Sequence, residues 1–197
     1  VWRKGLGELW KDTEFKTFWA IVAVTTALIT LNLFFKSDIS MWESFRYSMF
    51  TVASIISTTG FANSDFDLWP TFSKLILIML MFVGSCAGST AGGIKVSRIC
   101  VLWRTSVAEI KHVLHPNVVA NVNINGEPLP DGIVTAILRF FFLFMALFAL
   151  LVLLVAMTGL TATDAISAVA CTIGNVGPGF GVIGPTQTFA PLHPFAK

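Results

Sequence analysis

The chain has 197 residues, of which 55% are hydrophobic and 12% are charged, and its formal net charge is +2. Soluble domains carry about 25% charged residues, so this composition indicates an all-α integral membrane protein. The small net charge does not favour nucleic-acid binding, and the cysteines lack the CxxC spacing that is typical of metal sites.

Three uncharged runs are long enough, or nearly so, to cross a bilayer as helices, which takes about 20 apolar residues. The runs are Thr17–Phe35, Leu75–Ile94 and Phe140–Thr163. We therefore predict membrane-spanning helices over about 17–36, 71–112 and 132–158.

Two shorter apolar segments are predicted to be re-entrant half-helices, over about 40–57 and 162–173. Ser40 opens the first with a Ser-x-x-Glu capping pattern, and Thr161 opens the second with Thr-x-x-Asp. A glycine-containing loop follows each of them. Irregular backbone at membrane depth is tolerated where protein buries it or where it lines a wet cavity. The pattern therefore predicts two loops inside the membrane.

The same order of segments occurs twice along the chain, which indicates an internal repeat. Each unit has a long helix, a half-helix and a loop, and aligning Gly60 with Gly177 sets an offset of 117 residues. Val52-Ala53 then falls on Val169-Ala170. We predict one unit over 1–115, a cytoplasmic link over 116–130 and a partial second unit over 131–197 without a closing helix.

Basic residues predict how the chain crosses the membrane, because cytoplasmic loops carry an excess of lysine and arginine. They precede the first span and follow the second: Arg3, Lys4, Lys11 and Lys16, then Arg98, Arg104 and Lys111. We therefore expect a multi-pass protein of the cell membrane, with both half-helices entering from outside.

The two loops after the half-helices are candidate cation sites. The C-terminal end of a helix is partly negative, and a loop beyond it can present backbone carbonyls to a dehydrated cation. An ordinary glycine turn is the alternative for each loop. The candidate residues are Ser57, Thr58, Thr59, Gly60 and Phe61 in the first loop, and Gly174, Asn175, Val176, Gly177 and Pro178 in the second.

Small residues fill the stretch Gly84–Gly93, within the second long apolar run. Gly84, Gly88 and Gly92 recur at a spacing of four, which is typical of closely packed membrane helices. Adjacent glycines disfavour a helix, however, by about 1 kcal/mol each. The stretch is therefore either a packing seam or a deliberate break in the helix.

Catalytic groupings are missing from the predicted membrane segments, which contain neither a Ser/His/Asp set nor paired carboxylates. We interpret His112 and His115 as part of a solvated helix end that Pro116 terminates. An enzyme is therefore not expected.

Four stretches together form a distinctive set: "STTGF", "GSCAGSTAGGIKVSRI", "HPN" followed by "LP", and "GNVGPGFG". They resemble the Trk/Ktr/HKT superfamily of potassium transporters, and in particular its TrkH-type membrane subunits. The resemblance implies a fold of four M1–P–M2 repeats around one pore. This C-terminal portion would correspond to the third repeat and part of the fourth, with a glycine-rich break in one M2 helix.

The resemblance also implies a function, potassium uptake across the cell membrane, with K⁺ as the transported ion and no other cofactor in this chain. It implies a homodimer and a cytoplasmic nucleotide-binding regulatory subunit of the TrkA type. The implied K⁺ ligands are the backbone carbonyls of Thr58, Thr59, Gly60, Asn175, Val176 and Gly177. The implied gating loop contains Gly84, Gly88, Ser89, Thr90, Gly92 and Gly93, with Lys95 beside it.

Two other functions are compatible with the same pattern. One is a secondary transporter for another cation, built from broken helices and inverted repeats. The other is a membrane scaffold that transports nothing. Half-helices that enter from the same side argue against the inverted repeats.

Overall fold

The computed structural model describes residues 11–115, 122–188 and 190. Its α-helices are α2 (Thr13–Lys36), α3 (Met41–Ile56), α4 (Thr71–Met81), α5 (Val96–Leu114), α6 (Asp131–Ala156) and α7 (Ala162–Ile173). Two short 3-10 helices, η1 (Phe66–Leu68) and η2 (Gly181–Ile183), and a hairpin of β1 (Asn123–Ile124) and β2 (Glu127–Pro128) complete the described part. The basic residues Arg3 and Lys4, most of the "HPN" stretch and the last residues of the predicted second unit lie outside it.

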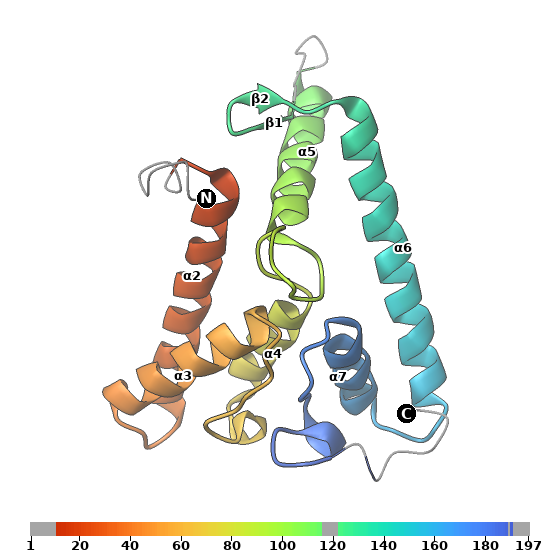
Figure 1. Cartoon of the computed structure of the whole chain (residues 1–197). Coiled ribbons are helices and arrows are strands. Elements are labelled where there is room, and N and C mark those ends of the chain that lie inside the picture. The colour runs from red at the N-terminus through yellow and green to blue at the C-terminus, as the bar shows by residue number, and fades with distance from the viewer. Residues whose placement is uncertain (1–10, 116–121, 189, 191–197) are drawn as a thin grey trace.

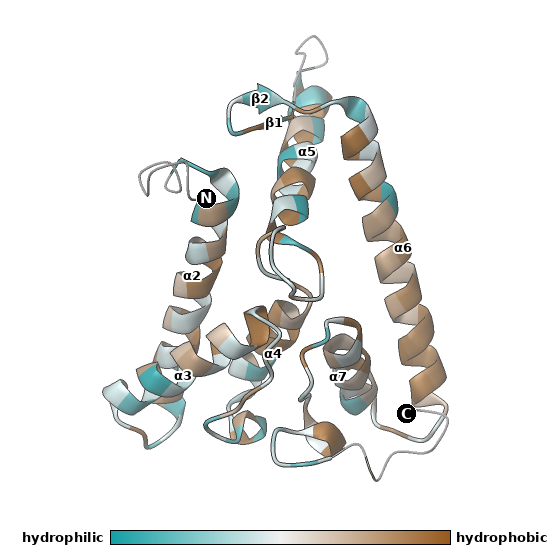
Figure 2. Ribbon diagram, in the orientation of Figure 1, coloured by the Kyte–Doolittle hydropathy of each residue, from teal (hydrophilic) through white to brown (hydrophobic). Residues whose placement is uncertain are grey.

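Two of the described helices, α2 and α6, are long and apolar enough to cross a membrane. The most apolar 18-residue window of helix α6 has a mean hydropathy of 2.8, and none of the helix's residues is buried by the rest of the described chain. Figure 2 shows apolar colour along most of its length. So large an exposed apolar surface is unusual for a soluble monomer, and it indicates a helix that faces lipid or other membrane helices.

Helix α2 begins four residues before the predicted span, at Thr13. The side chain of Asp12 caps it by accepting a hydrogen bond from the backbone N–H of Glu14. Such a cap satisfies one of the free N–H groups of the first turn. The helix therefore continues past the uncharged run into charged residues at its start.

The predicted span over about 71–112 consists of two helices, because α4 ends at Met81 and α5 begins at Val96. In Figure 1, α4 lies in the lower half of the structure and α5 above it, with the connecting loop at mid-height. A parallel bridge between Val83 and Ile94 closes the base of this loop. The residues Gly84, Gly88 and Gly92 therefore do not share one helix face, as a helical packing seam would require.

The two helices that correspond to the predicted half-helices, α3 and α7, both lie in the lower half of Figure 1. Helix α3 packs against α2, and α7 packs against α6. The apolar core lies where α3, α4 and α7 meet, and its fully buried members include Val52, Ile55, Leu77, Met81 and Cys171. The C-terminal parts of α3 and α7, which precede the two loops, are therefore buried by protein.

A hairpin occupies part of the predicted link. Its turn contains Asn125 and Gly126, which both have positive φ angles, 53° and 87°. An Asn-Gly pair favours such a turn because it matches the twist of paired strands. The hairpin, the start of α2 and the far end of α5 lie together at the end of the structure opposite the half-helices (Figure 1).

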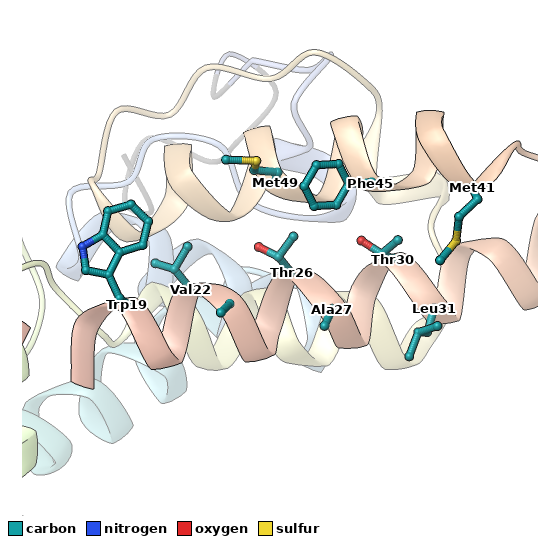
Figure 3. A pocket seen from close by; sticks show the side chains of 10 residues that line it. Trp19, Val22, Thr26, Ala27, Thr30, Leu31, Met41, Phe45 and Met49 are labelled. Atoms are coloured by element: carbon teal, nitrogen blue, oxygen red, sulfur yellow. The ribbon is translucent and has the colours of Figure 1, made fainter. Parts of the chain in front are cut away.

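A groove of about 490 Å³ lies between α2 and the N-terminal part of α3 (Figure 3). Thr26 and Thr30 point from α2 toward α3, and neither hydroxyl has a hydrogen-bond partner among the described residues. The α3 residues that line the groove are Met41, Phe45 and Met49. The groove is therefore separate from the loop that follows α3.

Candidate functional site

The two helix–loop junctions have matching backbone conformations at an offset of 117 residues. Thr58 and Asn175, at equivalent positions, both have φ of 54°, and the equivalent Gly60 and Gly177 have φ of 75° and 105°. Positive φ is a genuine outlier for a β-branched residue such as threonine. Strained backbone of this kind costs about 1–3 kcal/mol and clusters at functional sites.

The hydrogen bonds that end the two half-helices also correspond. In each junction a backbone N–H just after the helix returns to a carbonyl four or five residues earlier. The pairs are Ser57 N to Ala53 O (3.1 Å) with Gly174 N to Ala170 O (3.0 Å), and Thr59 N to Ser54 O (2.9 Å) with Val176 N to Cys171 O (2.8 Å). Each half-helix therefore ends at these bonds, and the backbone carbonyls that come after them belong to the loop.

Buried serines on the half-helices hold the loops, and the sequence analysis does not single them out. The hydroxyl of Ser54 donates to the carbonyl of Phe61 (2.6 Å), and the hydroxyl of Ser167 accepts from the N–H of Phe180 (2.6 Å). Both serines are buried. A serine within an apolar half-helix is the signal that would have identified them, because a buried hydroxyl requires a partner.

The two loops touch each other at Gly60. A Cβ on Gly60 would overlap the carbonyl oxygen of Val176 and lie 3.0 Å from the Cδ of Pro178. Glycine is therefore required at this position for two reasons, the positive φ angle and the close approach of a second backbone. By contrast, a Cβ on Gly177 would meet no atom within 4 Å.

Beyond the two loops, a second set of contacts joins the segment after α3 to the segment after α7. Asp67 accepts a hydrogen bond from the N–H of Gly181 (3.1 Å) and pairs with Lys74 (3.0 Å). The rings of Phe66 and Phe180 meet edge to face at 5.3 Å. The loop regions thus form one packed unit, although the two sequences are more than 110 residues apart.

The glycine-rich segment, defined here as Gly84–Gly93, contacts both junctions. The N–H of Gly92 faces the hydroxyl of Thr58 at 3.4 Å, and a Cβ on Gly92 would overlap the carbonyl oxygen of Gly174. The buried hydroxyl of Ser85 donates to the carbonyl of Ile56 (2.9 Å). The segment is therefore fixed against the ends of both half-helices.

Within the segment, the predicted residues have different surroundings. A Cβ on Gly84 would overlap the carbonyl of Gly92, whereas a Cβ on Gly88 would meet nothing within 4 Å. Ser89 and Thr90 are exposed, and Gly93 has a φ of 68°. The closely packed glycines therefore lie at the base of the loop, and its tip is open.

Lys95 holds the segment from one side. Its Nζ donates to the carbonyl of Ser89 (2.9 Å) and to the Ser89 hydroxyl (3.2 Å), and it also contacts the carbonyl of Ala91. The ammonium group is thus directed at loop carbonyls. Such charge-assisted bonds are stronger than bonds between neutral groups.

Comparison with known proteins gives consistent matches. The family model of TrkH, described as a cation transport protein, matches residues 9–197. The Trk system potassium uptake protein TrkH of Salmonella typhimurium is 33% identical over 98% of this chain and 40% of its own length. TrkH of Vibrio parahaemolyticus is 37% identical over 88% of this chain and 36% of its own length.

The solved structures include a similar fold over nearly the whole chain. The crystal structure of the potassium transporter TrkH from Vibrio parahaemolyticus has a TM-score of 0.86 and 35% identity, over 95% of this chain and 40% of that one. The chain spans about two fifths of the length of these relatives. These matches and the two membrane-length helices make it part of an integral cell-membrane protein. The chain belongs to the TrkH family of cation transport proteins.

Proposed function

We propose that this chain forms part of a pathway for potassium uptake, in which the two helix–loop junctions contribute to one selectivity filter. The observation that carries the proposal is the shared backbone of the junctions, with left-handed residues at equivalent positions and direct contact at Gly60. The proposal also draws on relatives that are named potassium uptake proteins.

In this proposal the K⁺ ligands are backbone carbonyls, which replace the ion's hydration shell. They come from Thr58, Thr59, Gly60, Asn175, Val176 and Gly177. The flanking residues Ser57, Phe61, Gly174 and Pro178 hold the two strands of the filter. Release of the ion requires that this coordination stay weak enough for conduction.

The repeat proposed here is M1–P–M2. Helices α2, α3 and the α4–α5 pair form one unit, and α6 and α7 begin the next. The positions of α3 and α7 in the same half of the structure support parallel repeats (Figure 1). An inverted-repeat transporter would place its two half-helices in opposite halves, so this arrangement argues against that alternative.

The glycine-rich segment is proposed to gate the pathway. Support comes from its contacts with Thr58 and with the carbonyl of Gly174, which place it directly beside both loops. Its tip is exposed and Gly88 meets open space, so the tip can move while the packed base of the loop stays in place. The homodimer and the TrkA-type regulatory subunit are proposed on the family resemblance alone, and crosslinking of the full-length protein in membranes tests them.

The experiment that tests the filter is rubidium uptake by the full-length protein reconstituted in liposomes. Gly60→Ser is expected to abolish selective uptake or to admit sodium, because it alters the carbonyl positions of both loops. Gly159→Ser is the matched control, since Gly159 also has a positive φ, 89°, but a side chain there meets open space and lies outside both loops and the glycine-rich segment. Selective uptake that Gly60→Ser leaves unchanged would contradict the proposal.

A further inference from the structure

One carboxylate links the start of α2 to the glycine-rich segment and to α5. A single oxygen of Glu14, Oε1, accepts the backbone N–H of Ala87 (2.6 Å) and that of Ser97 (3.2 Å). These partners are 73 and 83 residues away in the sequence. Glu14 is half-buried, and the sequence analysis assigns it no role.

Both donors suit a negative charge. Ser97 lies in the first turn of α5, where free N–H groups and the helix dipole favour an anion. Ala87 lies in the open part of the loop, so this bond fixes a part of the segment that packing leaves exposed. Hydrogen bonds to an ionised acceptor are shorter and stronger than neutral ones. Glu14, which is part of α2, therefore links the glycine-rich segment both to α2 and to α5.

The same turn of α2 is attached to the hairpin. The N–H of Thr13 donates to Oδ1 of Asn125 (2.8 Å), and the side-chain amide of Asn125 faces Oδ1 of Asp12 (3.3 Å). A continuous chain of contacts thus runs from the hairpin, through the first turn of α2, to Ala87. The hairpin belongs to the link that the basic residues predict to be cytoplasmic.

We propose that Glu14 is a positioning residue that restrains the glycine-rich segment in its closed place against the two loops. The proposal rests on the proposed function, in which this segment is the gate. When the carboxylate is removed, the tip is free to move away from α5. A displacement of the hairpin also displaces the tip, because Thr13 and Glu14 connect the two.

The chain contains its own reporter for this restraint. Cys86 directly precedes Ala87 and is partly exposed, whereas Cys100 and Cys171 are buried. The rate at which a neutral methanethiosulfonate reagent modifies Cys86 reports how freely the tip moves when the charge at position 14 is kept, because a nearby carboxylate also slows formation of the reactive thiolate. The measurement uses full-length protein in proteoliposomes, and the Cys86→Ala variant supplies the background from other thiols.

Glu14→Ala is expected to raise the Cys86 modification rate about tenfold, the ratio that corresponds to ~1.4 kcal/mol. Glu14→Gln keeps an acceptor oxygen at the same reach but loses the charge, so its rate is expected to lie between those of the unmodified protein and of Glu14→Ala. Glu14→Asp keeps the charge but is one methylene shorter, so it should behave like Glu14→Ala. Glu109→Ala, an exposed change on α5, is the matched control.

An unchanged rate in Glu14→Asp, which keeps the charge, would overturn the proposal, as would an equal rise in Glu109→Ala. If Glu14→Ala does not fold, the rate of Glu14→Asp against that of the unmodified protein decides. Labelling is independent of ion flux. A raised labelling rate without any change in rubidium uptake would therefore refute the gate and leave the restraint by Glu14 standing.

Discussion

Gly60 and Val176 occupy neighbouring places in two loops that are 116 positions apart in the sequence, and the α-carbon of one faces the carbonyl oxygen of the other. One half-helix therefore cannot change its loop without moving the other. A filter of carbonyls from several segments needs this kind of mutual support, because each carbonyl must keep its position while ions pass.

Gly60→Ala is expected to be more damaging than Gly177→Ala. Both substitutions place a Cβ at positive φ, which costs about 1–2 kcal/mol, but at Gly60 the new atom also overlaps Val176. Thermal unfolding of the purified protein and rubidium uptake should both show this order. Equal losses in the two variants would mean that the contact between the loops has no energetic effect.

Shortening the tip of the glycine-rich segment is expected to raise the flux of potassium. Deleting Cys86–Ser89 removes exposed residues but keeps Gly84 and Ile94, whose backbone bond closes the base of the loop. Uptake by a folded variant should rise severalfold if the tip obstructs the pathway. Unchanged uptake with normal stability would indicate that the segment only packs.

Ser54→Ala is expected to weaken selectivity, because it removes the hydrogen bond to the Phe61 carbonyl. The loss of one such bond costs about 1 kcal/mol, so the variant should fold. Ser106→Ala is the matched control, since Ser106 is exposed on α5, outside both loops, and its hydroxyl donates to the Leu102 carbonyl of its own helix. The measurement is the ratio of rubidium to sodium uptake, and equal ratios in the two variants would exclude a role for Ser54.

Signals that act over a few residues could be predicted from the sequence. The ends of α3 and α7 lie within about one residue of the predicted ends. The signals that predicted them are the capping residues Ser40 and Thr161 and the glycines after each half-helix. The composition of the second long run left two interpretations open, because glycines at a spacing of four also suit a packed helix, and the structure has the break. The Asn125-Gly126 turn has an equally local signal, because an Asn-Gly pair favours such a turn.

Contacts between distant segments could not be predicted in the same way. Glu14 looks like an ordinary acidic residue in the first turn of a helix, a position where such residues are common. Its role depends on the place of Ala87 and Ser97, which only the packing of α2 against α5 determines. The candidate residues of the site were thus available from sequence, but the bonds that hold them were not.

Lys95→Met is expected to loosen the glycine-rich segment at residues other than the one that Glu14 binds. The substitution keeps most of the apolar length of the side chain and removes the donor to the carbonyl and hydroxyl of Ser89. Hydrogen bonds to charged groups contribute about 1.5–3 kcal/mol, so both rubidium uptake and Cys86 modification should increase about tenfold or more. Lys111→Met, on the exposed end of α5, controls for the loss of charge.

Because Lys95 and Glu14 bind the same segment at different residues, the Cys86 modification rate of the double variant Lys95→Met with Glu14→Ala should exceed that of either single variant. A double variant no faster than Lys95→Met alone would show that Glu14 contributes nothing once the lysine is absent.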